Sequence, residues 1–97
     1  MIVGVCRVTI SIAGSYSLKD KRRVLKSVVE RVRHRFNVAV AEVDEHEVWN
    51  SGVIGLACVS TSGAHAEEML ATVVRFVEQA HPDAEVIDSS TEILSGF

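Results

Sequence analysis

Apolar and polar residues alternate along the first twelve positions of the chain. The even positions from Cys6 to Ile12 are apolar, and Arg7, Thr9 and Ser11 lie between them. A period of two is typical of a β-strand that has one face on the core. The pattern therefore predicts a strand over Ile2–Ile12.

The period changes to that of a helix after Ser17. Apolar residues then recur at the i, i+3, i+4, i+7 spacing of an amphipathic helix: Leu18, Val24, Leu25, Val28, Val29, Val32 and Phe36. Ser17 is expected to cap this helix, with Asp20 as its reciprocal partner, and Asn37 to end it in a left-handed conformation. Lys21 and Arg35, at the edge of the apolar sector, are expected to cover core surface with their stems while their charges reach water.

The remaining pattern predicts a hairpin, a second helix and a last strand. Val38–Val43 and Val48–Ser60 are apolar runs joined by a polar turn, and the second begins irregularly. Ser62-Gly63 is expected to cap a helix over Ala64–His81 that Pro82 stops. Glu85–Leu94 predicts the last strand.

The element order is β-α-β-β-α-β, within one domain over residues 1–97. Two interlocked strand–helix–strand crossovers predict an α+β ferredoxin-like sandwich, in which both helices cover one face of a four-stranded antiparallel sheet. The second face would then meet solvent, a ligand or another copy of the protein.

The third strand is apolar on both sides. If Ile54, Leu56 and Cys58 point inward, the open face presents four small or apolar residues: Val53, Gly55, Ala57 and Val59. Exposed apolar patches often mark an association surface, which favours a homodimer through this face. The alternative is that these small residues are tolerated on a solvated sheet.

Charge is concentrated on the first helix. Residues 17–36 hold eight of the ten Lys and Arg residues but only two of the thirteen acids. One flank carries Lys19, Arg22, Arg23, Lys26 and Arg33, which could contact several phosphates of a nucleic-acid backbone. The alternative is a solvated helix face, favoured by Glu30 within the stripe and by a pI near 5.7. Base stacking on the sheet is not expected, because the central strands carry no aromatic residue there.

Other chemistry finds little support in the sequence. Cys6 and Cys58 are expected to be buried reduced thiols, and a polar turn is the preferred interpretation of Asp44, His46 and Glu47 over a metal site with Glu42. Trp49 is expected to fold back as a lid on the core, although an exposed anchor for a partner stays open. No nucleophile or phosphate-loop motif is present, so we expect no enzyme and no cofactor. No apolar run approaches the ~20 residues of a membrane span, and the default is a soluble cytoplasmic protein.

Two segments resemble a known family. SLKDKRRVLKS at residues 17–27 and RHRFNVAVAEV at 33–43, with a Trp a few residues on, are similar to the signature of the YlxP-like family of small bacterial proteins. Asp20 stands where the family has Glu, and Ala39 where it has Ser. The resemblance implies a ferredoxin-like fold and brings no established catalytic residues. It also implies a link to translation, because genes of the family often neighbour those for translation initiation and ribosome-maturation factors.

The sequence therefore favours a non-enzymatic accessory protein that contacts RNA or the ribosome through its basic helix. The alternative is a homodimeric protein-interaction or small-ligand-sensing module, in which the same charges only solvate the helix.

Overall fold

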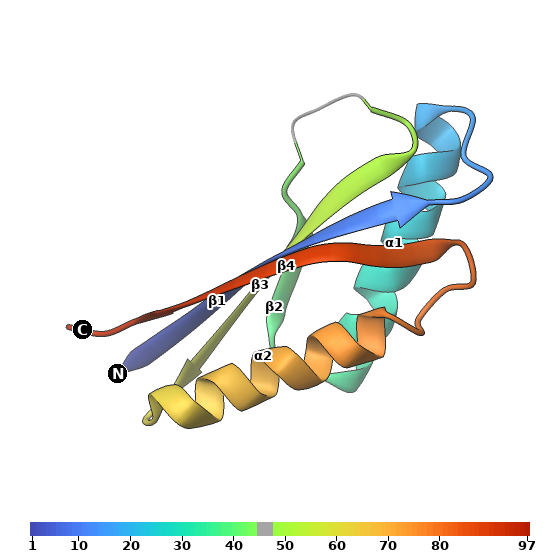
Figure 1. Ribbon diagram of the computed structural model, residues 1–97. Coiled ribbons are helices and arrows are strands. Elements are labelled where there is room, and N and C mark those ends of the chain that lie inside the picture. The colour runs from blue at the N-terminus through green and yellow to red at the C-terminus, as the bar shows by residue number, and fades with distance from the viewer. Residues whose placement is uncertain (45–47) are drawn as a thin grey trace.

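The computed structural model describes residues 1–44 and 48–97, and the element order is the predicted one (Figure 1). Most of the turn predicted at residues 44–47 lies outside the described residues. The elements are β1 (Ile2–Ile12), α1 (Leu18–Arg35), β2 (Ala39–Glu42), β3 (Ser51–Ser60), α2 (Gly63–Val77) and β4 (Ala84–Leu94).

The four strands form one sheet in the order β2-β3-β1-β4, and every neighbouring pair is antiparallel. The two longest pairings bring β1 against β3 and β4, so the first strand of the chain lies in the middle of the sheet. A bulge in β4 leaves Ile87 unpaired, because Thr9 faces Asp88 whereas Ile10 faces Val86. The predicted α+β ferredoxin-like sandwich is confirmed.

Both helices pack on the same face of the sheet. The alternating apolar positions of β1 and β3 share one buried core with the apolar sides of α1 and α2. Two glycines allow close contact there. A Cβ on Gly4 would lie 2.9 Å from Leu70 Cδ1, and one on Gly52 would collide with the Leu25 side chain. Each helix thus packs against strand backbone at a position where a side chain would not fit.

The N-cap of α1 follows the prediction, but the reciprocal bond and the end of the helix do not. The Asp20 carboxylate accepts from the N–H of Tyr16, one residue before the expected donor. Ser17 is the N-cap, and its hydroxyl accepts a hydrogen bond from the N–H of Asp20 at 3.1 Å. Phe36 ends the helix in extended backbone, and no residue other than glycine has a positive φ in the described ranges. The left-handed stop expected at Asn37 is therefore wrong: the chain leaves α1 directly into extended backbone that leads to β2.

The second helix ends earlier than the sequence predicts. It stops at Val77, and the next turn tightens, because the N–H of Ala80 donates to the carbonyl of Val77. Ala80 is buried, so this tight turn brings an apolar residue back into the core before Pro82. No helix in residues 1–44 and 48–97 is long and apolar enough to cross a membrane.

Lys21 is the clearest departure from the pattern. Its Nζ lies 2.7 Å from Asp44 Oδ2, and the two side chains are 7% and 6% exposed. The expectation that the charge reaches water is wrong, because the segment that follows β2 covers this side of α1 and supplies the opposite charge. A buried charge is tolerated only when it is paired in this way.

The open face is partly covered by the chain itself. Val53 is only 7% exposed but lies outside the main core, and a Cβ on Gly55 would meet the side chain of Val43. Ala57 is half-buried and Val59 is 64% exposed. Of the four residues expected to form the dimer face, the accessible apolar surface therefore comes from Ala57 and Val59, with Val43 lying over Gly55.

Candidate nucleic-acid interface

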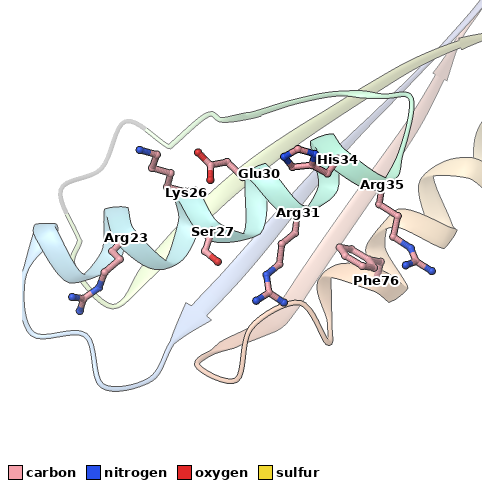
Figure 2. A pocket seen from close by; sticks show the side chains of 8 residues that line it. All are labelled: Arg23, Lys26, Ser27, Glu30, Arg31, His34, Arg35 and Phe76. Atoms are coloured by element: carbon pink, nitrogen blue, oxygen red, sulfur yellow. The ribbon is translucent and has the colours of Figure 1, made fainter.

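A concave surface of about 720 Å³ runs along the solvent side of α1 and ends against Phe76 of α2. We call it the α1 groove. Figure 2 shows Arg31 and Arg35 on the side of α1 that faces α2, whereas Lys26 and Glu30 point away from α2. Its lining residues are Arg23, Lys26, Ser27, Glu30, Arg31, His34, Arg35 and Phe76.

The groove is positive because its cations outnumber its acids. It has four Lys and Arg side chains and one carboxylate, that of Glu30. Arg23 is bound to Asp20, with Nη2 3.1 Å from Oδ1, but the Arg23 side chain is 74% exposed. An exposed pair of this kind contributes only about 0–1 kcal/mol, so a phosphate can displace Asp20 at little cost.

One end of the groove holds an arginine in place. The guanidinium carbon of Arg35 lies 5.2 Å from the ring centre of Phe76 and 6.0 Å from that of Phe36. The two rings pack edge to face, with their centres 5.3 Å apart. Such contacts orient the guanidinium without neutralising it, so its hydrogen-bond donors stay available to a ligand.

The structure separates the five cations predicted from the sequence into three positions. Arg23 and Lys26 line the α1 groove. Lys19 and Arg22 are exposed on the first two turns of α1, before the groove. Arg33 turns to the other side, where its Nη2 donates to the carbonyl of Val40 in β2 at 3.2 Å.

Sequence reasoning missed the second wall of the groove. Ser27, Arg31 and Arg35 form an i, i+4, i+8 row on α1, which a helical wheel places together. Nothing in the sequence shows that Phe76 packs beside this row. Arg75 also lies near it, since Arg35 and Arg75 line one shallow depression, so the positive surface extends onto α2.

The structure also bears on three other predictions, which concern Trp49, a metal site and the two cysteines. Trp49 is 44% exposed and stacks on Tyr16, so the expectation of a lid over the core is wrong. His46 and Glu47 of the metal alternative lie outside the described residues, and the rest of the chain holds no group of three or more His, Cys, Asp or Glu that suits a metal ion. Cys6 and Cys58 are buried free thiols, as predicted.

Comparison with known proteins supports the fold and a family. The chain is 37% identical over 87 residues to the uncharacterised protein YlxP of Bacillus subtilis (strain 168), covering 90% of this chain and 91% of that protein. Its fold is similar to the acylphosphatase of Bacillus subtilis, with a TM-score of 0.57 and 18% identity over 100% of this chain and 89% of the other. The de novo designed protein Foldit4 gives a TM-score of 0.52 and 12% identity over 99% and 98% of the two chains. At such identities these two structures show a shared fold and nothing of activity.

The sequence family is shown by a match along most of the chain. A family model described as "Protein of unknown function (DUF503)" matches residues 3–91, a span that includes both helices and the segments that resemble YlxP-like proteins. The chain therefore belongs to the DUF503 family, with YlxP among its relatives.

Proposed function

We propose that this chain is a non-enzymatic accessory protein that contacts the phosphates of RNA, including ribosomal RNA, through the exposed side of α1. The observation that carries the proposal is that three basic side chains of α1 are exposed and have no partner among the described residues. The side chains of Lys19, Arg22 and Lys26 are exposed and form no ion pair or hydrogen bond with any residue that the structure describes. Their charges are available to an external anion.

The length of the surface suits a polyanion better than a small anion. From Lys19 to Arg35 the helix rises ~24 Å at 1.5 Å per residue. A nucleic-acid strand presents several phosphates over that distance, and each contact releases counterions, which gives sequence-independent and salt-sensitive binding.

The competing interpretation is a basic helix that serves only to offset the acidic remainder of the protein. It requires the acids to lie near α1. Among the residues described, Asp44 and Asp20 are the acids that form ion pairs with α1, and Asp44 binds the buried Lys21. The geometry thus favours an external partner.

Electrophoretic mobility shift with single-stranded and structured RNA, at two salt concentrations, tests the proposal. Wild type is expected to shift both RNAs at low salt and to lose them at high salt. The variant Lys19→Gln/Arg22→Gln/Lys26→Gln, which removes three positive charges, is expected to shift both RNAs much more weakly than wild type at low salt.

The matched control is Ser89→Glu/Thr91→Glu/Ser95→Glu. It changes the net charge by the same amount at exposed positions on β4 and the following tail, and it is expected to bind nearly as well as wild type. Equal loss in both variants would show a response to net charge alone, and no shift of wild type at low salt would contradict the proposal.

A second candidate, association with another copy of the chain, is favoured by the open sheet face. A groove crosses this face and is lined by small residues of β2 and β3, including Ala39, Ala41 and Ala57. Arg7 of β1 and Glu92 of β4 also line it. Opposite charges on one surface suit a two-fold dimer, because Arg7 of each copy can pair with Glu92 of the other copy. This association is compatible with RNA contact, since α1 lies on the other side of the sheet.

A further inference from the structure

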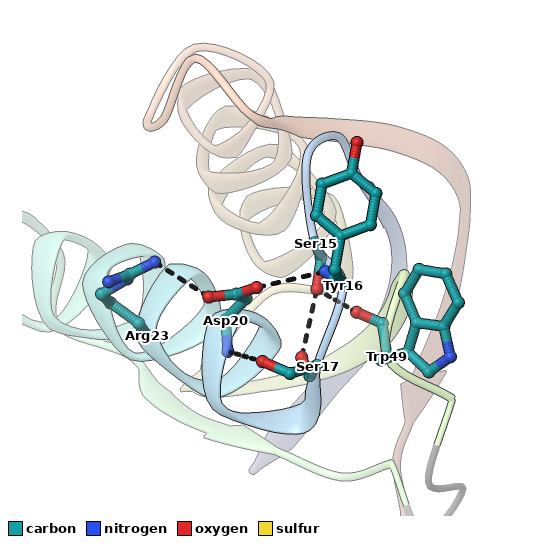
Figure 3. A network of polar contacts seen from close by, with 6 residues as sticks. All are labelled: Ser15, Tyr16, Ser17, Asp20, Arg23 and Trp49. Atoms are coloured by element: carbon teal, nitrogen blue, oxygen red, sulfur yellow. Dashed lines mark hydrogen bonds and ion pairs between the residues drawn. The ribbon is translucent and has the colours of Figure 1, made fainter.

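Tyr16 and Trp49 form an exposed aromatic pair beside the start of α1 (Figure 3). Their ring centres are 6.2 Å apart and the planes are inclined by 30°. Tyr16 is 81% exposed and Trp49 is 44% exposed. They are the only Tyr and the only Trp of the chain, and the fold brings them together from the β1–α1 and β2–β3 connections.

Hydrogen bonds hold the backbone of both residues. Ser15 is buried, and its hydroxyl contacts the backbone carbonyl of Trp49. The same hydroxyl oxygen lies 3.3 Å from the backbone carbonyl oxygen of Ser17. The N–H of Tyr16 donates to Asp20 Oδ2 at 3.1 Å. The rings are thus exposed while the backbone that carries them is fixed, which lowers the entropy cost of binding a partner.

The aromatic pair adjoins the positive charges of α1. Asp20 accepts from the N–H of Tyr16 with one oxygen and from the guanidinium of Arg23 with the other, each at 3.1 Å. Lys19 and Arg22 lie three and six residues after Tyr16 in the chain. An apolar stacking surface and a cationic track therefore meet at the beginning of the helix.

We propose that Tyr16 and Trp49 are a stacking site for an unpaired base of single-stranded RNA whose backbone continues along α1. This inference rests on the proposed RNA contact and deepens it. Proteins that bind single strands combine a positive groove for the backbone with aromatic rings on which bases stack. Since β1 and β3 carry no aromatic residue, stacking in this protein occurs at the sheet end rather than on the sheet face.

The single Trp makes the test direct. Wild type is titrated with a single-stranded adenine oligonucleotide, with an RNA duplex of the same length and with inorganic polyphosphate, while Trp fluorescence is followed. The single strand is expected to quench Trp49 at saturation, the duplex to quench it less, and polyphosphate to bind without quenching.

Variants at Tyr16 separate stacking from charge. Because the side chain is exposed, Tyr16→Ala is expected to fold, which far-UV circular dichroism checks. Fluorescence anisotropy is expected to show its affinity for a labelled single strand about ten-fold weaker, within the range seen for one stacked base, with polyphosphate affinity unchanged. Tyr16→Phe keeps the ring and is expected to match wild type.

The outcomes distinguish this inference from the proposal on which it rests. If single strands bind without quenching and with equal affinity for wild type and Tyr16→Ala, the stacking site is wrong and phosphate contact along α1 stands. If neither RNA nor polyphosphate binds at low salt, both are wrong. Equal loss of RNA and polyphosphate affinity in Tyr16→Ala would also contradict stacking.

Discussion

At the scale of single residues, the buried pair of Lys21 and Asp44 joins α1 to the segment after β2. Their charged atoms are 2.7 Å apart and both side chains are almost completely buried. Removing one partner from such a pair leaves the other charge desolvated, which costs more than the pair itself contributes.

We expect Lys21→Met to lower the free energy of unfolding by about 3–5 kcal/mol. The double variant Lys21→Met/Asp44→Leu is expected to recover most of that loss, since it removes both charges. Urea denaturation followed by circular dichroism measures these differences. Lys19→Met, at an exposed position of the same helix, is the control and should stay within about 0.5 kcal/mol of wild type. A single variant as stable as wild type would contradict the role of the pair.

The burial of Lys21 shows what a helical wheel leaves out. The wheel places Lys21 beside the apolar sector, where long basic side chains usually bury their stems and keep the charged group in water. The partner, Asp44, lies 23 residues further along the chain, and no local pattern connects the two. Trp49 was mispredicted for the same reason, because its stacking partner Tyr16 is distant in sequence.

At the scale of elements, the amphipathic pattern and the cap of α1 were predictable because both are local. Ser17 lies just before the first apolar residue of the periodic stretch, and its hydroxyl accepts from the N–H three residues on. Ser62 has the same relation to His65 at the start of α2. The two caps therefore offer a matched comparison.

Ser17→Ala and Ser62→Ala are each expected to lower stability by about 1 kcal/mol, because each leaves an N–H group of the first helical turn without its side-chain acceptor. The midpoint of urea denaturation, read with an unchanged slope, measures the loss. Ser95→Ala, in the exposed tail, serves as the control. A change in both cap variants no larger than in this control would contradict the assigned caps.

The ends of the helices and the composition of the α1 groove were harder to predict. α2 stops before Pro82 because the core takes up Ala80, which is a tertiary effect. The predicted stripe from Lys19 to Arg33 is split, since β2 offers the carbonyl of Val40 to Arg33. Arg35 is held in the groove by the ring of Phe76 from α2, a contact that the sequence does not reveal, and Arg31 lines the same groove.

At the scale of the whole molecule, the fold was predictable from the element order alone. Six elements with two crossover helices admit few arrangements, and the ferredoxin-like one leaves a sheet face without helices. The sequence could not show how far the chain covers that face. Val43 lies against Gly55 and Val53 is buried, so the accessible apolar part is smaller than the alternation of β3 suggests.

If the chain dimerises through the open face, a carboxylate introduced on that face should separate the two copies. Light scattering of wild type is expected to give a mass of about 21 kDa, twice the 10.6 kDa of one chain. Ala57→Glu is expected to give the monomer mass, because it places a larger, charged side chain in the groove between Val5 and Ala39, which flank Ala57. Gln79→Glu, exposed on the helix side, adds the same charge and should leave the mass unchanged. A wild-type monomer at high concentration would contradict the dimer.

The central claim is that α1 neutralises RNA phosphates, and the salt dependence of binding tests it most directly. The affinity of a single-stranded RNA is measured over a series of salt concentrations for wild type and for Lys19→Gln/Arg22→Gln/Lys26→Gln. Each phosphate contact on a single strand contributes ~0.7 to the slope of log affinity against log salt, so losing three cations should reduce its magnitude by about 2. Equal slopes in the two proteins, or no binding by wild type at low salt, would contradict the account.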